Sequence, residues 1–217
     1  MVHIRPTFVT DGFYHVYNRG VAKQPLFVND SDRDHLLKTL SFYLESEPPK
    51  RLSIVSDELL LETLSQLVTS PLVEILAYCL MPNHFHLLVK QRSDGGVSTF
   101  LRRAQNSYTR YYNTKYYRVG TMFQGRFHAV EVTTDAQLLH VSRYIHLNPV
   151  VARLSKKASD YNWSSYPQYV QGQGNRLCNP SMILAMAHSP ENYDQFVTDY
   201  MDYAISLHDY KDLLLDV

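Results

Sequence analysis

The sequence predicts an α+β fold, in which a ferredoxin-like or RRM-like antiparallel sheet carries helices on one face and is followed by a helical C-terminal extension. Two observations indicate this class. Four short segments alternate apolar and polar residues with the period of a strand. Segments with helical spacing separate them in the order strand, helix, strand, strand, helix, strand, helix. Such a sheet leaves its other face open.

The four predicted strands are recognised by alternation and by enrichment in β-branched and aromatic residues. Residues 13–19 form the first strand, and residues 73–80 form the second. The third begins at Phe85, after the short connection 81–83, which predicts a tight antiparallel hairpin. The fourth covers residues 126–133.

The three predicted core helices combine apolar residues at helical spacing with polar capping residues before them. They span residues 33–44 (capped by 29–32), 99–116 (capped by Ser98) and 135–147 (capped by Asp135, with Asn148-Pro149 ending it or starting a new helix).

The chain divides into a core domain over residues 1–170 and an acidic, helical extension over 171–217. Within the core domain, the leucine-rich segment 51–72 is predicted to be a helical insertion. Residues 180–187 and 192–204 of the extension have helical patterns.

Composition narrows the class of protein further. A length of 217 residues suits one domain with an appendage, and 45% hydrophobic residues can build a core. No apolar run is long enough to cross a membrane, and the first residues lack the apolar region of a signal peptide. Two cysteines do not form a disulfide framework, so we expect a buried free thiol at Cys79 and a cytoplasmic location.

The net charge of zero conceals an uneven distribution of charge. Residues 95–130 contain no acidic residue but several basic ones, whereas residues 198–217 carry five aspartates against Lys211 alone. The middle of the chain therefore offers a positive patch to a polyanion. The alternative is that these are ordinary solvated helix faces.

His84 and His86 lie two apart on the predicted third strand, so both imidazoles point to one face. Two imidazoles on a rigid strand can bind one metal ion. The pair is a weak signal by itself, because ten histidines in 217 residues can produce one by chance.

The helix predicted over 135–147 strengthens this signal. His140, Tyr144 and Asn148 fall on one stripe at i, i+4 and i+8. A tyrosine one turn from an amide is consistent with a nucleophile beside a metal ligand. Two plainer interpretations stay open: Tyr144 lies at the border of helix and sheet, or Asn148 caps the segment after it.

Five motifs in this order resemble those of the REP-associated tyrosine transposases, which belong to the single-tyrosine HUH transposase superfamily. The resemblance covers about residues 8–170, and each motif alone is weak while the ordered set is specific. The motifs are Tyr14-His-Val-Tyr-Asn-Arg-Gly20, Met81-Pro-Asn-His-Phe-His-Leu-Leu-Val89, Phe123-Gln-Gly-Arg-Phe127, Tyr144-Ile-His-Leu-Asn-Pro-Val150 and Trp163-Ser-Ser-Tyr166.

The resemblance implies an RRM-like enzyme that acts on single-stranded DNA, often folded as a hairpin. It implies that His84, His86 and Asn148 bind Mg²⁺ or Mn²⁺, and that Tyr144 is the nucleophile. A divalent ion can stabilise charge at the scissile phosphate, which a neutral tyrosine attacks poorly on its own. The expected product is a 5′-phosphotyrosine with a released 3′-hydroxyl.

Basic residues supply most of the expected DNA contacts. Asn18 and Arg19, at the end of the first strand, are added because they belong to one of the five motifs. A homodimer is possible. The predicted set is Asn18, Arg19, Arg102, Arg103, Arg110, Lys115, Arg118 and Arg126. Tyr108, Tyr111 and Tyr112 could stack bases or pack on the sheet.

Two other functions remain open. A non-catalytic RRM-like nucleic-acid-binding module would not need Tyr144 and the histidine pair together. A metal-dependent hydrolase that activates water would cleave without a covalent adduct to the protein.

Overall fold

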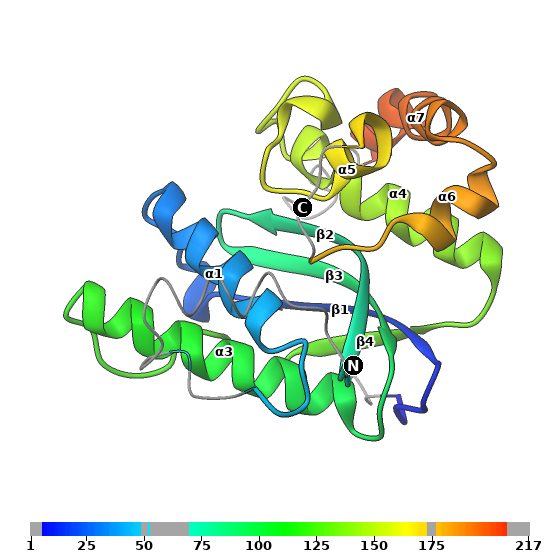
Figure 1. Ribbon diagram of the computed structural model, residues 1–217. Coiled ribbons are helices and arrows are strands. Elements are labelled where there is room, and N and C mark those ends of the chain that lie inside the picture. The colour runs from blue at the N-terminus through cyan, green and yellow to red at the C-terminus, as the bar shows by residue number, and fades with distance from the viewer. Residues whose placement is uncertain (1–5, 49–51, 53–69, 173–176, 208–217) are drawn as a thin grey trace.

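The computed structural model describes residues 6–48, 52, 70–172 and 177–207. Its centre is a four-stranded sheet in the order β2-β3-β1-β4 (Figure 1). The paired strands are antiparallel throughout. This is the strand order of the ferredoxin-like fold, so the predicted fold class is confirmed. The strands are β1 (Phe13–Arg19), β2 (Val73–Met81), β3 (His84–Gln91) and β4 (His128–Val132).

Two helices cover one face of the sheet: α1 (Asp30–Phe42) and α3 (Gly96–Lys115). Figure 1 shows the two helices beside each other, on the side of the sheet away from α4. Val16, Leu87 and Phe100 are fully buried in this layer. The alternation predicted for the strands is therefore real, because every second residue of β1 and β3 is buried here.

The other face is partly covered rather than open, which refines the predicted arrangement. The helix α4 (Asp135–Val151) packs on β2 and β3, and the C-terminal helices gather around it (Figure 1). The shorter elements are η1 (Val21–Lys23), η3 (Ala158–Asp160), α5 (Tyr166–Gln171), α6 (Ser181–Ala187), α7 (Pro190–Thr198) and a helical segment over 201–207.

The predicted tight hairpin joins β2 and β3, with Met81 paired to His84 across the turn. The predicted helix ends differ by a few residues. The N-cap of α4 is Thr134, whose hydroxyl accepts the Gln137 N–H, so Asp135 is the first helical residue. The helix then continues through Pro149 to Val151, because a proline in the last turn removes one backbone bond without ending the helix.

The guanidinium of Arg143 is one of the contacts between α4 and the extension. The side chain of Arg143 lies 4.1 Å from the ring centre of Phe196 and 3.7 Å from that of Tyr200. Cation–π contacts of this kind fix the extension to the helix that carries Tyr144. Cys79 and Cys178 are both buried free thiols, as predicted for Cys79.

Most of the predicted helical insertion lies outside the described residues. Its two ends are held together, since Ser46 N–H donates to the Ser70 carbonyl and Leu72 N–H to the Leu44 carbonyl. Among the residues that the structure describes, none of the helices is long and apolar enough to span a membrane.

Candidate active site on the sheet

The two histidines of the His-x-His pair lie at the start of β3, on the face that α4 covers. Their ring centres are 4.9 Å apart and the rings are nearly perpendicular. His86 is 5% exposed, and His84 is half-buried. Strand alternation places both on one face, as the sequence predicted.

Each imidazole forms a hydrogen bond through its Nδ1 atom, and none of the described hydrogen bonds involves its Nε2 atom. His84 Nδ1 is 2.6 Å from Asn83 Oδ1, and His86 Nδ1 is 2.9 Å from His15 Nε2. His86 Nε2 is buried without a hydrogen-bond partner. A buried polar atom without a partner is costly, so this nitrogen is suited to a ligand.

The pKa values keep these rings neutral at pH 7. Burial, with smaller effects of the His15 and His84 rings, holds the pKa of His86 well below 6.5. Burial and the Arg19 charge lower the pKa of His84, and burial lowers that of His15 to about 4. A neutral imidazole has the lone pair that metal binding requires.

Tyr144 projects from α4 onto this pair. Its ring stands edge-on to those of His86 and His15, with centres 5.6 and 5.7 Å away. The side chain is 52% exposed, so a substrate can reach it. Desolvation above the sheet raises the pKa of Tyr144, against a smaller lowering effect of Asn148, so its resting state is the neutral phenol.

Asn148 lies one turn further along α4, and its Nδ2 donates to the Tyr144 carbonyl at 2.8 Å. This bond fixes the amide and leaves Oδ1 as the atom that can bind a cation. A cavity of about 520 Å³ joins the strand and the helix here. Its lining includes Met81, His84, His140, Tyr144, Asn148 and, from the extension, Tyr200, Ala204 and Leu207.

A buried polar chain sets the position of α4. His146 Nδ1 is 2.8 Å from the Tyr193 hydroxyl, and its Nε2 is 2.8 Å from Ser165 Oγ. Ser165 Oγ accepts the Tyr78 N–H of β2, which ties the helix to the sheet. Burial lowers the pKa of His146 to about 3, so this ring is a neutral structural link two residues from Tyr144.

Two neutral imidazoles and one amide oxygen fit a divalent cation with open positions for phosphate oxygens or water. In the described part of the chain, no group of three or more His, Cys, Asp or Glu side chains could hold a metal ion. The predicted set takes its third ligand from an amide, which explains why it does not form such a group.

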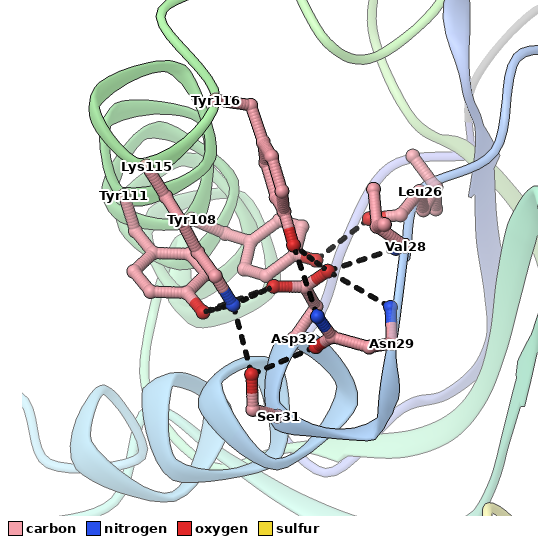
Figure 2. A network of polar contacts seen from close by, with 9 residues as sticks. All are labelled: Leu26, Val28, Asn29, Ser31, Asp32, Tyr108, Tyr111, Lys115 and Tyr116. Atoms are coloured by element: carbon pink, nitrogen blue, oxygen red, sulfur yellow. Dashed lines mark hydrogen bonds and ion pairs between the residues drawn. The ribbon is translucent and has the colours of Figure 1, made fainter.

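Three predicted DNA contacts are held by a backbone carbonyl or by a buried carboxylate. Asn18 is 1% exposed, and its amide donates to Gln105 Oε1 and to the Gly125 carbonyl. Arg103 donates to the Ser46 carbonyl at 2.6 Å. Lys115 Nζ lies 2.6 Å from Asp32 Oδ1, inside a polar network between α1 and α3 (Figure 2).

The remaining basic residues divide between the two sides of the sheet. Arg19 ends β1 opposite His84, with its Nε bonded to Gln124 Oε1, and exposed Arg126 precedes β4 at the same end. Both lie at the end of the sheet that carries His84. Arg102 and Arg110 are exposed on α3, which covers the opposite face, and Arg118 contacts Gln24 and the Tyr112 ring.

Of the two alternatives for Tyr108, Tyr111 and Tyr112, the structure shows packing inside the protein rather than rings free to stack bases. Tyr108 is fully buried and Tyr112 is 6% exposed, so both pack in the core. Tyr111 donates its hydroxyl to Asp32 and stacks on His35, with ring centres 3.6 Å apart.

Sequence reasoning undervalued His15 and His140. Strand alternation puts His15 on the His86 face, but only the pairing of β1 with β3 makes the two rings neighbours. His140 lines the cavity one turn before Tyr144. The sequence pattern that indicates His140 is its position on the same helix stripe as Tyr144 and Asn148.

Comparisons with known proteins agree with this geometry. Residues 49–148, which include all four candidate site residues, match the family model described as "Transposase IS200 like". A solved REP-associated tyrosine transposase bound to a REP hairpin has the same fold, with a TM-score of 0.57 and 17% sequence identity. The match covers 79% of this chain and 86% of that chain. No curated protein sequence matches.

Over residues 49–148 the chain is therefore similar to the IS200-like transposases. The resemblance to the REP-associated tyrosine transposases that the five motifs indicate agrees with both findings, because the IS200-like model matches the segment that carries the candidate site and a solved REP-associated tyrosine transposase shares the fold.

Proposed function

We propose that this chain cleaves and rejoins single-stranded DNA through a covalent bond to Tyr144. The observation that carries the proposal is the position of the Tyr144 ring, which stands edge-on to His86 while the helix below it brings Asn148 to the same cavity as His84. A partly exposed tyrosine above two neutral imidazoles suits phosphoryl transfer better than core packing.

His84, His86 and Asn148 would hold the cation, Mg²⁺ or Mn²⁺, through two Nε2 atoms and one amide oxygen. When bound, the cation would polarise the scissile phosphate and offset the charge that develops on it. The buried Nε2 of His86, which has no other partner, supports this assignment.

In the proposed reaction the Tyr144 hydroxyl loses its proton and its oxygen bonds to phosphorus. The bond from phosphorus to the 3′-oxygen breaks, and that oxygen takes up a proton as a free 3′-hydroxyl. The 5′-phosphotyrosine keeps a phosphodiester bond, so a 3′-hydroxyl can reverse the step and join strands.

We infer that Arg19 and Arg126 contact the backbone of the strand being cut, because they lie at the end of the sheet that carries His84. Arg102, Arg110 and Arg118 would contact more distant parts of a hairpin. Asn18, Arg103 and Lys115 are left out of the proposed contacts, since backbone carbonyls or the buried Asp32 carboxylate hold their donors. A homodimer stays a prediction.

The test is formation of an adduct. Purified protein is incubated with a single-stranded hairpin oligonucleotide from the flank of its own gene, with Mg²⁺ or Mn²⁺, and run on a denaturing gel. Tyr144→Phe should abolish the adduct and keep DNA binding. Tyr117→Phe is the matched control, because Tyr117 is 97% exposed on a loop.

The outcomes separate the rival functions. An adduct that survives Tyr144→Phe would refute the choice of nucleophile. Cleavage by the wild type without any adduct would indicate a hydrolase that activates water. Binding without cleavage under all metal conditions would indicate a non-catalytic module.

A further inference from the structure

We propose that His15 is a positioning residue for the metal centre: it accepts the Nδ1 proton of His86 and thereby leaves the His86 Nε2 lone pair for the cation. This inference rests on the proposed function of His84 and His86 as ligands, and it adds a residue that the His-x-His motif does not contain.

The contact is close and rigid. His15 Nε2 lies 2.9 Å from His86 Nδ1, a distance that requires one proton between the two nitrogens. Their rings are stacked, with centres 5.1 Å apart and planes at 23°. Antiparallel pairing of β1 with β3 makes the two residues diagonal neighbours, because His86 pairs with Tyr17 and His15 pairs with Leu88.

Only one placement of the proton allows His86 to bind a cation. If His86 carries its proton on Nδ1, that N–H donates to His15 and Nε2 keeps its lone pair. If His86 carries it on Nε2, an N–H is buried at a position where no acceptor lies within hydrogen-bond distance. The acceptor His15 Nε2 and the buried His86 Nε2, which has no partner, therefore both favour the His86 tautomer that carries its proton on Nδ1.

His84 shows the same arrangement with a different partner. The Asn83 amide donates through Nδ2 to the Lys23 carbonyl, so its Oδ1 faces His84 Nδ1 at 2.6 Å. An amide oxygen can only accept, so His84 also carries its proton on Nδ1. Both histidines are thus held by an acceptor on Nδ1, with Nε2 left for a ligand.

The identity of the acceptor matters chemically. An imidazole, unlike the carboxylate that often holds a metal-binding histidine, adds no negative charge beside the ligand. The full charge of a bound divalent cation then remains available to phosphate oxygens. The His15 ring also makes a T-shaped contact with the Tyr144 ring, so the same side chain supports the proposed ligand and the proposed nucleophile.

Two substitutions test the inference without requiring activity. Gln in place of His15 can put an amide oxygen near the position of Nε2, whereas Leu removes the acceptor. Mn²⁺ alone is titrated into the full-length protein, and the signal of free Mn²⁺ is followed by electron paramagnetic resonance. His128→Leu is the matched control, because His128 lies on the same sheet face but stacks on Tyr17.

We expect His15→Leu to weaken Mn²⁺ binding by about 10–100-fold. His15→Gln and His128→Leu should bind close to the wild type. If His15→Leu binds like the wild type, or if Leu and Gln weaken binding equally, His15 does not act as an acceptor and the inference is overturned. If the wild type binds no Mn²⁺, or His86→Ala does not weaken binding, the proposed metal centre itself fails.

A measurement on the wild type covers the case in which His15→Leu does not fold. A long-range proton–nitrogen correlation spectrum of the imidazoles, recorded with Mg²⁺, reports which nitrogen of each ring carries the proton. Protonation of His86 at Nδ1 supports the inference. Protonation at Nε2 overturns it.

Discussion

Replacing Asp32 with asparagine is expected to lower the free energy of unfolding by about 2–3 kcal/mol at pH 7. Asp32 is fully buried between α1 and α3 (Figure 2). Its Oδ1 accepts from Lys115 Nζ and the Tyr111 hydroxyl, and its Oδ2 from the Tyr116 hydroxyl and the Val28 N–H. An amide in its place would point two hydrogens toward some of these donors.

The magnitude follows from the pKa of Asp32. Burial alone would raise it, but hydrogen bonds from Lys115, the Val28 N–H, Tyr116 and Tyr111 outweigh burial and lower the pKa from 3.8 to about 2. At ~1.4 kcal/mol for each pKa unit, the charged form stabilises the fold by about 2 kcal/mol. Donors left facing an amide add to the loss.

The sign of the pH dependence is fixed by this depressed pKa. The stabilisation is present above pH 4, where Asp32 is ionised in both states, and it is lost as the pH falls toward 2. The assay is urea unfolding followed by the fluorescence of Trp163, the single tryptophan. Stability of the wild type and of Asp32→Asn should converge as the pH falls below 4.

The matched control is Asp30→Asn on the same helix. Asp30 pairs with Arg33 but its side chain is 75% exposed, so its loss should cost less than about 0.5 kcal/mol. Lys115→Met should also destabilise the fold while leaving the affinity for single-stranded DNA unchanged. A loss at Asp32 as small as at Asp30, or one that persists unchanged down to pH 2, would refute the reasoning.

Three further predictions concern the site and its supports. Arg19→Ala should weaken binding of single-stranded DNA and lower the salt slope by about 0.7, as measured by fluorescence anisotropy, whereas Lys38→Ala on the opposite face should not. His146→Leu should lower the free energy of unfolding by about 2–4 kcal/mol, since Ser165 and Tyr193 lose their buried partner; a loss below about 1 kcal/mol would contradict this. Gly20→Ala should destabilise the protein more than Gly172→Ala. A Cβ at Gly20 would lie 2.1 Å from the Gln24 carbonyl oxygen, whereas Gly172 has open space around it and only a positive φ. Equal melting temperatures of the two variants would exclude the clash.

The fold could be predicted because its signals are local. Alternation within 13–19 and the two-residue turn before His84 both depend on residues close in sequence, and the order of elements then favours one antiparallel sheet. The sequence predicted an open sheet face, and the extent to which α4 covers this face over β2 and β3 was not predicted. It depends on contacts such as that between Ser165 and Tyr78, which are far apart in the chain.

The basic residues show what a linear charge pattern leaves out. Residues 95–130 contain no acid, so Lys115 looked free to bind phosphate. Its partner Asp32 comes from α1, 83 residues earlier, and neutralises it in the fold. Arg103 is bonded in the same way to a backbone carbonyl of a distant segment. Which cations stay free depends on tertiary contacts that composition cannot show.

The position of the candidate site follows from the uneven cover of one sheet face. Over β2 and β3 this face is covered by α4, which brings Tyr144 to the histidines and shields His86 from solvent. Toward β4 it is accessible, since Val130 is 50% exposed in the part of the chain that the structure describes. The proposed nucleophile on a helix and the proposed ligands on a strand can both reach a DNA strand along the border between these two halves. Tyr144, half-exposed above His86, lies on that border, and a site further under α4 would keep the proposed metal ligands but exclude the proposed DNA substrate.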